Sequence, residues 1–342
     1  MQLKNRIKDH IDRGEFKENQ NVTSIREISR ITGISLATVQ KAYRELKQEK
    51  CIYAKAGAGY FVSRPASLSD TVFVFLPNSR LSFYTSILDG MFEANRNNDL
   101  NIQIYSLDTD KLAWNEKTIE VLRVARRDKN GVIFIEEAFG EMRRECLATA
   151  KKVPFVTIEW ILENAVSIVN DYRKAGYAMV DYLVTKRGAR SMIVMKGREK
   201  QYNAHERILG MREAALHHNL VEGESIVFID TDFNAISGYE AIKKNYPVPY
   251  QCDAVICAND YEAMGAIGAF MEKRVLVGKD VALLGFGNMI EPVTTYVPLT
   301  TMDQRLKLIG IKAVQAINNL RKGTGCDGSI LTISAKLVER KT

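Results

Sequence analysis

Residue types that commonly carry catalysis or bind metals are scattered along this 342-residue chain. The cysteines are Cys51, Cys146, Cys252, Cys257 and Cys326. Only Cys252 and Cys257 lie close together, and no second pair or histidine cluster completes a zinc site, which predicts reduced, buried thiols. His217 and His218 are adjacent on a predicted helix, so they point to different, solvent-facing sides and cannot chelate as an i, i+4 pair would. We therefore predict no metal site.

Glycine-rich and catalytic motifs are also incomplete. Gly285-Phe286-Gly287 could begin a dinucleotide-binding fingerprint, but no third glycine follows at Ile290, and the triplet lies late in the chain. No Gly-x-x-x-x-Gly-Lys-Ser/Thr phosphate loop is present, and no Ser/His/Asp arrangement has motif support. The sequence thus predicts a protein that is not an enzyme, with no catalytic residues and no cofactor.

Positive charge is concentrated in the first fifth of the chain. Residues 1–64 hold 13 Lys and Arg against 7 Asp and Glu, whereas the remaining residues hold 35 against 34. A basic segment on an electrically neutral body is typical of a nucleic-acid-binding head. Because charged helices are often only solvated surfaces, the charge by itself does not decide the function.

Apolar periodicity and capping residues predict two helices at the start of this basic segment. Apolar residues recur every four positions over 3–13, which indicates an amphipathic helix that ends at Gly14. A second helix begins near Ser24, with Glu27 at capping-box spacing, and stops at Gly33. Its predicted apolar face consists of Ile25, Ile28 and Ile31.

A third helix and a hairpin follow. The helix starts at Ser35, and its apolar residues are Val39, Ala42, Tyr43 and Leu46. Helix, Gly-containing turn and helix make the helix-turn-helix pattern. The β-prone stretches 51–54 and 60–63 flank the glycine-containing run 55–59, which predicts a β-hairpin wing.

The stretches Thr23–Ile28, Thr32–Leu46 and Gly57–Val62 together resemble the winged helix-turn-helix of the GntR family over residues 1–64. The resemblance implies that the third helix enters the major groove, that the wing glycines let the backbone approach the minor groove, and that Arg26 reads a guanine. The DNA-binding residues it implies are Arg26, Ser35, Thr38, Gln40, Lys41, Arg44, Lys55, Gly57 and Gly59, with Lys41, Arg44 and Lys55 as phosphate contacts. Leu36, Ala37 and Gln40 depart from the residues of many members, so the operator sequence is not predicted.

After the connector-like residues 65–70, strand-like apolar runs alternate with helical segments. The predicted strands include Thr71–Leu76, Ile102–Tyr105, Gly131–Ile135, Phe155–Ile158, Ser191–Met195, Ser225–Ile229, Ala254–Ala258 and Val281–Phe286. Short apolar strands between helices predict parallel sheets covered on both faces, and so many of them suit two doubly wound lobes better than one. Ligands of such folds bind outside the carboxyl ends of the strands.

This body resembles the effector domain of the LacI/GalR family, a relative of periplasmic sugar-binding proteins. The matching stretches, in chain order, are Gly131–Ile135, Val153–Glu159, Val169–Asp171, Glu206–Met211, Ser237–Ala241, Cys257–Ala266, Leu284–Asn288 and Pro298–Gln304. The resemblance implies an effector bound between the lobes and a two-fold dimer.

By matched position, the resemblance also implies a set of effector-binding residues. They are Ser82, Phe83, Glu159, Arg207, Phe233 and Asn259. Arg207 would hydrogen-bond the effector, Glu159 would be an acidic ligand at a strand end, and Phe233 would pack on a sugar ring. Directional polar groups beside an aromatic face suit vicinal hydroxyls and the C–H side of a neutral sugar. Gly287 stands where many sugar-binding members have an aspartate, so the identity of the sugar is not predicted.

The predicted fold is an α+β winged helix-turn-helix head followed by an α/β body of two doubly wound parallel-sheet lobes, of the periplasmic-binding-protein-like type I. The head spans residues 1–64, the linker 65–70, and the effector-binding and dimerisation domain 71–342. We assign about 71–169 and 296–325 to lobe 1, and about 170–295 and 326–342 to lobe 2.

A GntR-type head on a LacI-type body resembles the arrangement of arabinose repressors and some deoxyhexose regulators. It implies a homodimeric repressor of a sugar-catabolism operon that binds double-stranded operator DNA and is relieved by a small neutral sugar, such as arabinose or fucose. Two alternatives remain open: a GntR head fused to a cofactor-dependent enzyme-like domain, and a ligand-independent DNA-binding protein.

No apolar run reaches the roughly 18 residues of a membrane span, and the first residues lack a signal-peptide pattern, so we expect no membrane partner and a cytoplasmic location.

Overall fold

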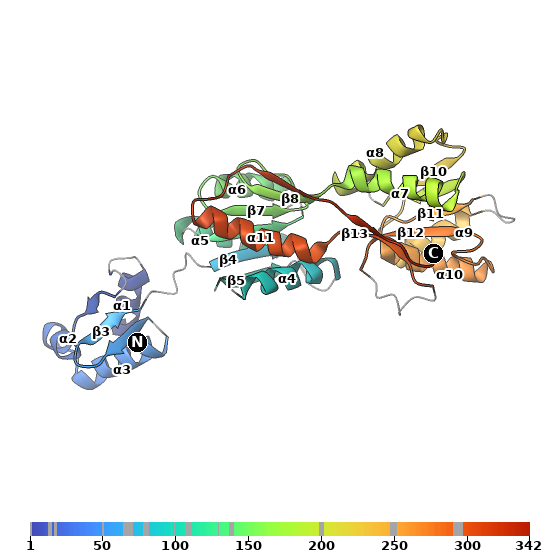
Figure 1. Ribbon diagram of the computed structural model, residues 1–342. Coiled ribbons are helices and arrows are strands. Elements are labelled where there is room, and N and C mark those ends of the chain that lie inside the picture. Colours follow the sequence, from blue (N-terminus) through green and yellow to red (C-terminus); the bar gives the residue numbers. More distant parts are fainter. Residues whose placement is uncertain are drawn as a thin grey trace.

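The structure is a computed structural model that describes a head and a two-lobed body (Figure 1). The described residues are 2–12, 16, 19–49, 51–63, 71–77, 82–96, 98, 100–106, 111–128, 130–136, 140–197, 202–246, 252–289 and 297–342. Within these ranges, no helix has the length and apolar character that crossing a membrane requires.

The head packs three helices against a small antiparallel sheet. Its elements are α1 (Gln2–Asp12), β1 (Asn21–Val22), α2 (Ile25–Thr32), α3 (Leu36–Gln48), β2 (Ile52–Lys55) and β3 (Gly59–Val62), with strand order β1-β3-β2. The predicted buried face of α3 is confirmed, because Val39, Tyr43 and Leu46 lie in the core. The prediction for Ile31 is wrong: its side chain is 67% exposed, since the short α2 contributes only Ile25 and Ile28 to the core.

Lobe 1 is a six-stranded parallel sheet covered by helices on both faces. Its strand order is β14 (Ile330–Ile333), β8 (Val166–Asn170), β7 (Phe155–Ile158), β6 (Gly131–Ile135), β4 (Thr71–Leu76) and β5 (Asn101–Ser106). Alternate residues of a strand face opposite sides. Val72 and Val74 therefore join the core with α4 (Ser82–Asn95) and α11 (Leu306–Arg321). Phe73 and Phe75 face α5 (Lys111–Asp128) and α6 (Gly140–Ala150).

Lobe 2 repeats this three-layer architecture. Its strand order is β10 (Ile226–Ile229), β9 (Met192–Met195), β11 (Ala254–Ile256), β12 (Ala282–Gly287), β13 (Thr300–Asp303) and β15 (Lys336–Val338), of which only β15 pairs antiparallel. Helices α7 (Tyr172–Arg187) and α8 (Tyr202–His217) cover one face, and α9 (Ala235–Asn245) and α10 (Asp260–Glu272) cover the other. A Cβ on Gly176 would lie 2.0 Å from the Arg207 carbonyl oxygen, so α7 and α8 pack backbone against backbone.

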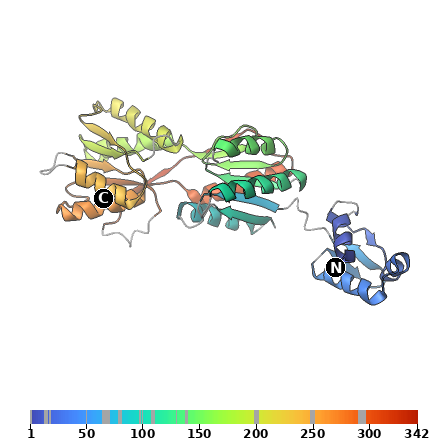
Figure 2. The same ribbon diagram turned by 180° about the vertical axis from the view of Figure 1, so that it is seen from behind.

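The chain crosses between the lobes between β8 and α7, between β13 and α11, and between β14 and β15. The dark red C-terminal segment can be followed from lobe 1 to lobe 2 in both views (Figure 1 and Figure 2). The expected lobe assignment is therefore wrong for two strands. Thr300–Asp303, expected in lobe 1, pairs with β12 in lobe 2, and Ile330–Ile333, expected in lobe 2, pairs with β8 in lobe 1. Local composition does not reveal which strands pair with one another.

Candidate functional site

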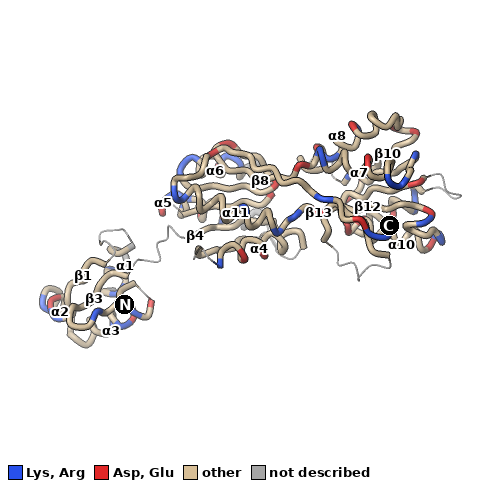
Figure 3. Tube along the Cα trace, in the orientation of Figure 1, with Lys and Arg blue, Asp and Glu red and all other residues tan. Residues whose placement is uncertain are grey.

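One face of α3 carries exposed polar and cationic side chains at helical spacing. Gln40, Lys41 and Arg44 lie at positions i, i+1 and i+4 on one side of the helix, and all three are exposed. The opposite face is buried in the head core. Helix α3 therefore presents a continuous polar stripe to solvent, as a helix that enters a DNA groove must. The Lys and Arg positions of the head are marked blue in Figure 3.

Two serine caps fix where α2 and α3 begin. Ser24 Oγ accepts from the Glu27 N–H (3.2 Å), and Ser35 Oγ accepts from the Thr38 N–H (3.3 Å). Ser35 Oγ and Thr38 Oγ1 also share a hydrogen bond of 2.8 Å. The predicted N-cap at Ser24 and the predicted start of the third helix at Ser35 are thus confirmed. Ser35 and Thr38 are exposed at the amino end of α3, where a phosphate would meet free helix N–H groups.

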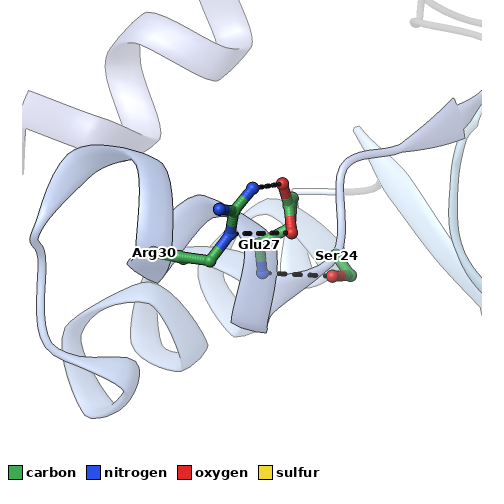
Figure 4. Close-up of polar contacts among 3 residues, drawn as sticks. All are labelled: Ser24, Glu27 and Arg30. Atoms are coloured by element: carbon green, nitrogen blue, oxygen red, sulfur yellow. Dashed lines mark hydrogen bonds and ion pairs between the residues drawn. The ribbon is translucent and has the colours of Figure 1, made fainter.

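Arg26 is exposed near the start of α2, beside an acidic residue that is already paired. The Glu27 carboxylate accepts from Arg30 Nη2 at 2.5 Å and from Arg30 Nε at 3.4 Å (Figure 4). The Glu27 carboxylate therefore does not make the second bond of a capping box, in which it would accept from the backbone N–H of Ser24. No hydrogen bond or ion pair joins Arg26 to another described residue, so its guanidinium donors remain available to a base or a phosphate.

The wing is a tight hairpin between β2 and β3. The Ala58 N–H donates to the Lys55 carbonyl (3.0 Å), and Gly57 and Gly59 have φ of 73° and 101°. Such positive φ values favour glycine. A Cβ at Gly57 would meet open space, so the absent side chain leaves the tip free for close approach to another molecule. Lys55 is exposed at the same turn.

A cavity of about 330 Å³ is lined by residues from both lobes. Phe83, Tyr84 and Glu136 contribute from lobe 1, and Arg207, Phe233, Asn259, Tyr261 and Phe286 are among those from lobe 2. Tyr172 and Gln304 line it from the ends of the first two interlobe crossings. The carboxyl ends of β6, β12 and β13 lead into this cavity, which is where ligands of doubly wound folds bind.

Arg207 is the most unusual group in the cavity wall. It is 4% exposed, and its Nη2 has no hydrogen-bond partner among the described residues. Its Cζ lies 4.4 Å from the Phe286 ring centroid. Burial lowers the pKa of Arg207 to about 10, and Tyr172 and Glu262 oppose that shift. The group therefore stays charged at neutral pH while one of its donors lacks an acceptor, an arrangement that a ligand would relieve.

Residues 1–62 match the model of bacterial regulatory proteins, gntR family, and residues 180–342 match that of the periplasmic binding protein-like domain. The chain is 26% identical over 337 residues to the HTH-type transcriptional regulator RegA of Clostridium saccharobutylicum, covering 94% of this chain and 99% of that protein. It is 23% identical over 338 residues to the HTH-type transcriptional repressor PurR of Vibrio cholerae, with 94% and 98% covered.

Among solved structures, the complex of the transcriptional regulator CelR with cellobiose matches with a TM-score of 0.68 at 17% identity, covering 94% of this chain and 99% of that one. The chain is a DNA-binding transcriptional regulator. Its gntR-family head and periplasmic binding protein-like body confirm the predicted combination of folds.

The structure of the regulator brings four of the six predicted effector residues to the cavity wall, namely Phe83, Arg207, Phe233 and Asn259. Ser82 lies beside it on α4, and its Oγ is 2.7 Å from the Tyr261 hydroxyl of α10, so a direct hydrogen bond joins the two lobes. Glu159 does not line the cavity.

Phe233 and Asn259 hold each other in place. Asn259 Nδ2 donates to the Phe233 carbonyl (2.8 Å), while Asn259 Oδ1 accepts from the Glu262 N–H (2.9 Å) and caps α10. The Phe233 N–H donates to Glu262 Oε1 (2.9 Å), which supports a left-handed backbone with φ of 58°. Both polar atoms of the Asn259 amide therefore already make hydrogen bonds that position Phe233 and α10. A ligand could use only the second N–H of Nδ2 and the second lone pair of Oδ1.

Glu159 is 6% exposed and lies among buried polar groups near the first interlobe crossing. Its Oε1 accepts from Asn170 Nδ2 (3.0 Å), whereas its Oε2 and Asn170 Oδ1 have no partner of normal hydrogen-bond geometry among the described residues. Burial raises the pKa of Glu159 to about 7, and Tyr172 and Asn170 oppose that shift. Tyr172 lines the cavity and influences the Glu159 carboxyl group, so Glu159 is connected to the site only through Tyr172.

Sequence reasoning missed Tyr84, Glu136, Tyr172 and Gln304. Three of them had a signal, because Glu136 and Gln304 directly follow strands β6 and β13, and Tyr172 lies two residues after β8. Searching every strand end would have found them. Tyr84 lies within α4 and had no comparable signal.

Gly287, which stands where many sugar-binding members have an aspartate, has a backbone conformation that suits only glycine. Gly287 has φ of 130°, and a Cβ there would lie 2.8 Å from Met289 Cε. Any L side chain would be strained in that backbone conformation. The regulator thus forms its site without a carboxylate at this strand end.

The cysteine and histidine predictions hold in part. Cys146, Cys252 and Cys257 are buried free thiols, but Cys326 is exposed and Cys51 is half-buried. The His217 and His218 rings stack at 4.8 Å instead of pointing apart, and His218 Nε2 lies 2.9 Å from Asp181 Oδ1. Over the part of the chain that the structure describes, no three His, Cys, Asp or Glu side chains form a group that could hold a metal ion.

Proposed function

We propose that this regulator represses a sugar-catabolism operon and that a small neutral sugar, a pentose or a deoxyhexose, binds in the interlobe cavity and relieves repression. One observation carries the proposal: the buried, charged Arg207 has an unpartnered Nη2 in the wall of that cavity. A planar guanidinium with fixed donors suits two adjacent hydroxyl groups.

Aromatic side chains of the cavity support a sugar in particular. Phe83, Phe233 and Phe286 all line it, and aromatic faces pack against the C–H side of a sugar ring. The charges that line the described wall are one carboxylate, Glu136, and one guanidinium, Arg207, which balance for a neutral ligand. The related CelR structure contains cellobiose, which is consistent with a sugar site in this fold.

The proposed mechanism is a shift between open and closed lobe arrangements. An effector that contacts both lobes favours the arrangement in which both sets of contacts exist. The lobes are joined by three chain crossings, so closure changes the orientation of lobe 1, to which the head is connected in sequence. In a dimer, that change displaces two heads relative to two operator half-sites.

For the dimer, we propose contact through α4 and α10 with a second copy of this chain. Large apolar side chains are exposed there: Phe92 is 48% exposed on α4, and Met264 and Met271 are 38% and 50% exposed on α10. Both helices lie along the lower side of the body in Figure 1. Large exposed apolar side chains on neighbouring sides of the two lobes favour a protein interface, and two-fold pairing places one surface against its own copy.

A thermal-shift screen of the full chain against pentoses, hexoses and deoxyhexoses, followed by calorimetry, tests the effector proposal. Arg207→Ala should lower the affinity for the sugar that binds by roughly ten- to a hundredfold, since each hydroxyl left unpaired costs about 1–3 kcal/mol. Operator affinity without sugar should be unchanged, which gives a repressor that cannot be induced. Arg212→Ala is the matched control, because Arg212 lies on the same helix and pairs with Glu222 at 3.0 Å.

Two results would contradict the proposal. Unchanged sugar affinity in Arg207→Ala would remove its central residue. A chain that responds to no sugar in the screen would favour the ligand-independent alternative.

A further inference from the structure

A half-buried carboxylate, that of Glu136, lines the interlobe cavity from the lobe opposite Arg207. Glu136 directly follows β6 and adopts a left-handed backbone with φ of 67°. That conformation is uncommon for a residue other than glycine or asparagine. Its N–H donates to the Ile158 carbonyl (2.8 Å), which anchors the backbone at the end of the neighbouring strand β7. The fold therefore maintains an unfavourable backbone conformation at the point where the Glu136 side chain joins the cavity wall.

One oxygen of this carboxylate is held in place. The Tyr84 hydroxyl of α4 donates to Glu136 Oε2 at 2.7 Å. No described residue donates to Oε1, although the side chain lines the cavity. Burial raises the pKa of Glu136, and only the bond from Tyr84 opposes that shift. Oε1 therefore has no protein donor among the described residues, and a ligand with hydrogen-bond donors would supply one.

We propose that Glu136 contacts the effector, that Tyr84 positions it, and that the pair makes the site select unphosphorylated sugars over sugar phosphates. This inference rests on the proposed function, and it identifies the ligand class more closely. Arg207 donates from lobe 2 and Glu136 accepts from lobe 1. A hydroxyl group, which both donates and accepts, satisfies either one, so a polyol can bridge the lobes.

The same two residues disfavour an anionic ligand. A phosphate group carries about −1.5 to −2 charge at neutral pH. It could pair with Arg207, but the Glu262 carboxylate already lies near that guanidinium, and Glu136 lines the same cavity. A phosphorylated sugar therefore adds charge for which the described cavity wall offers no second cation. Like-charge contact in a buried site is strongly unfavourable.

The test is calorimetry on the full chain with three pairs of ligands: ribose and ribose 5-phosphate, arabinose and arabinose 5-phosphate, and fucose and fucose 1-phosphate. At least one free sugar should bind, and its phosphate should bind about 100-fold more weakly or worse. Glu136→Gln should weaken the free sugar about tenfold, because it replaces a charged acceptor with a neutral amide. It should weaken the phosphate less, so the ratio of the two dissociation constants should shrink.

Tyr84→Phe should produce a smaller change in the same direction, because it frees the carboxylate without removing it. The matched control is Glu120→Gln, an exposed glutamate of α5 outside the cavity, which should change neither affinity. A merely structural role for Glu136 would weaken both ligands alike and leave the ratio constant, and that result would overturn the inference.

The remaining outcomes separate the two proposals. If Arg207→Ala abolishes sugar binding while Glu136→Gln leaves it unchanged, the sugar-effector proposal stands and this inference is wrong. If a sugar phosphate binds more tightly than its free sugar, the selectivity is wrong. If none of the six compounds binds, and none of the wider sugar panel does, the proposed function fails and this inference fails with it.

Discussion

Replacing Glu159 with glutamine should remove a pH-dependent loss of stability from the regulator. Glu159 is buried, with one oxygen bonded to Asn170 and the other without a partner of normal geometry among the described residues. Burial raises its pKa from 4.5 to about 7. Between these two values the folded chain holds a proton at Glu159 that the unfolded chain has released.

Stability therefore falls as pH rises through this window, and the contribution of Glu159 is retained in full only below about pH 4.5. The difference between the two pKa values corresponds to about 3 kcal/mol of unfolding free energy lost by the time the pH is above 7. Glutamine has nearly the same shape and no charge, and its amide can donate where the carboxylate could only accept.

Urea unfolding of the full chain at pH 5 and pH 8 measures the effect, with the fluorescence of the buried Trp160 as one reporter of lobe 1. Glu136, Asp260 and Glu262 also have pKa values raised by burial, so the wild-type slope has several sources. The difference between wild type and Glu159→Gln isolates one of them. Glu120→Gln, on the surface, should preserve the wild-type slope. If Glu159→Gln and wild type lose the same unfolding free energy between the two pH values, the pKa of Glu159 is not raised in the folded chain. That result would contradict the prediction.

Arg26→Ala should weaken operator binding by roughly 1–3 kcal/mol and relax one base position, measured by fluorescence anisotropy on operator and random duplexes. Arg30→Ala, whose guanidinium pairs with Glu27, is its control, and equal losses on both duplexes for Arg26→Ala would indicate a phosphate contact only. Light scattering should give a dimer for the full chain, and Met271→Asp should shift it toward monomer; a wild-type monomer at micromolar concentration would contradict the α4–α10 surface. Tyr261→Phe removes the hydrogen bond to Ser82 and should lower sugar affinity severalfold. If the double variant Ser82→Ala/Tyr261→Phe loses the sum of the binding free energies lost by the two single variants, the two residues are not coupled, and that result would count against an interlobe role for the bond.

Local sequence signals determined much of this protein. The helices begin at Ser24 and Ser35 as predicted, Ser24 from its capping pattern, because a cap depends on groups within three residues. The alternation of apolar strands and helices predicted two parallel-sheet lobes, since strands covered on both faces must be apolar throughout. Matched motifs also led to Arg207, which the structure places in the cavity wall.

Tertiary structure decided which side chains meet. Glu159 and Glu136 both follow strands of one sheet with similar positive φ values, yet only Glu136 lines the cavity. The difference lies in their long-range partners, because Glu136 is bonded by Tyr84 of α4 and Glu159 by Asn170 of β8. Asn259 was predicted as a ligand, but its Oδ1 caps α10 through the nearby Glu262 N–H, and its Nδ2 donates to the Phe233 carbonyl. The second bond joins two loops, and only packing establishes it. Strands 300–303 and 330–333 exchanged lobes relative to the prediction, because hydrogen-bonded pairing decides the lobe. Strand 330–333 pairs with β8, more than a hundred residues earlier in the chain, and strand 300–303 pairs with β12. Short-range patterns specify elements, whereas the site arises from long-range contacts that no local pattern encodes.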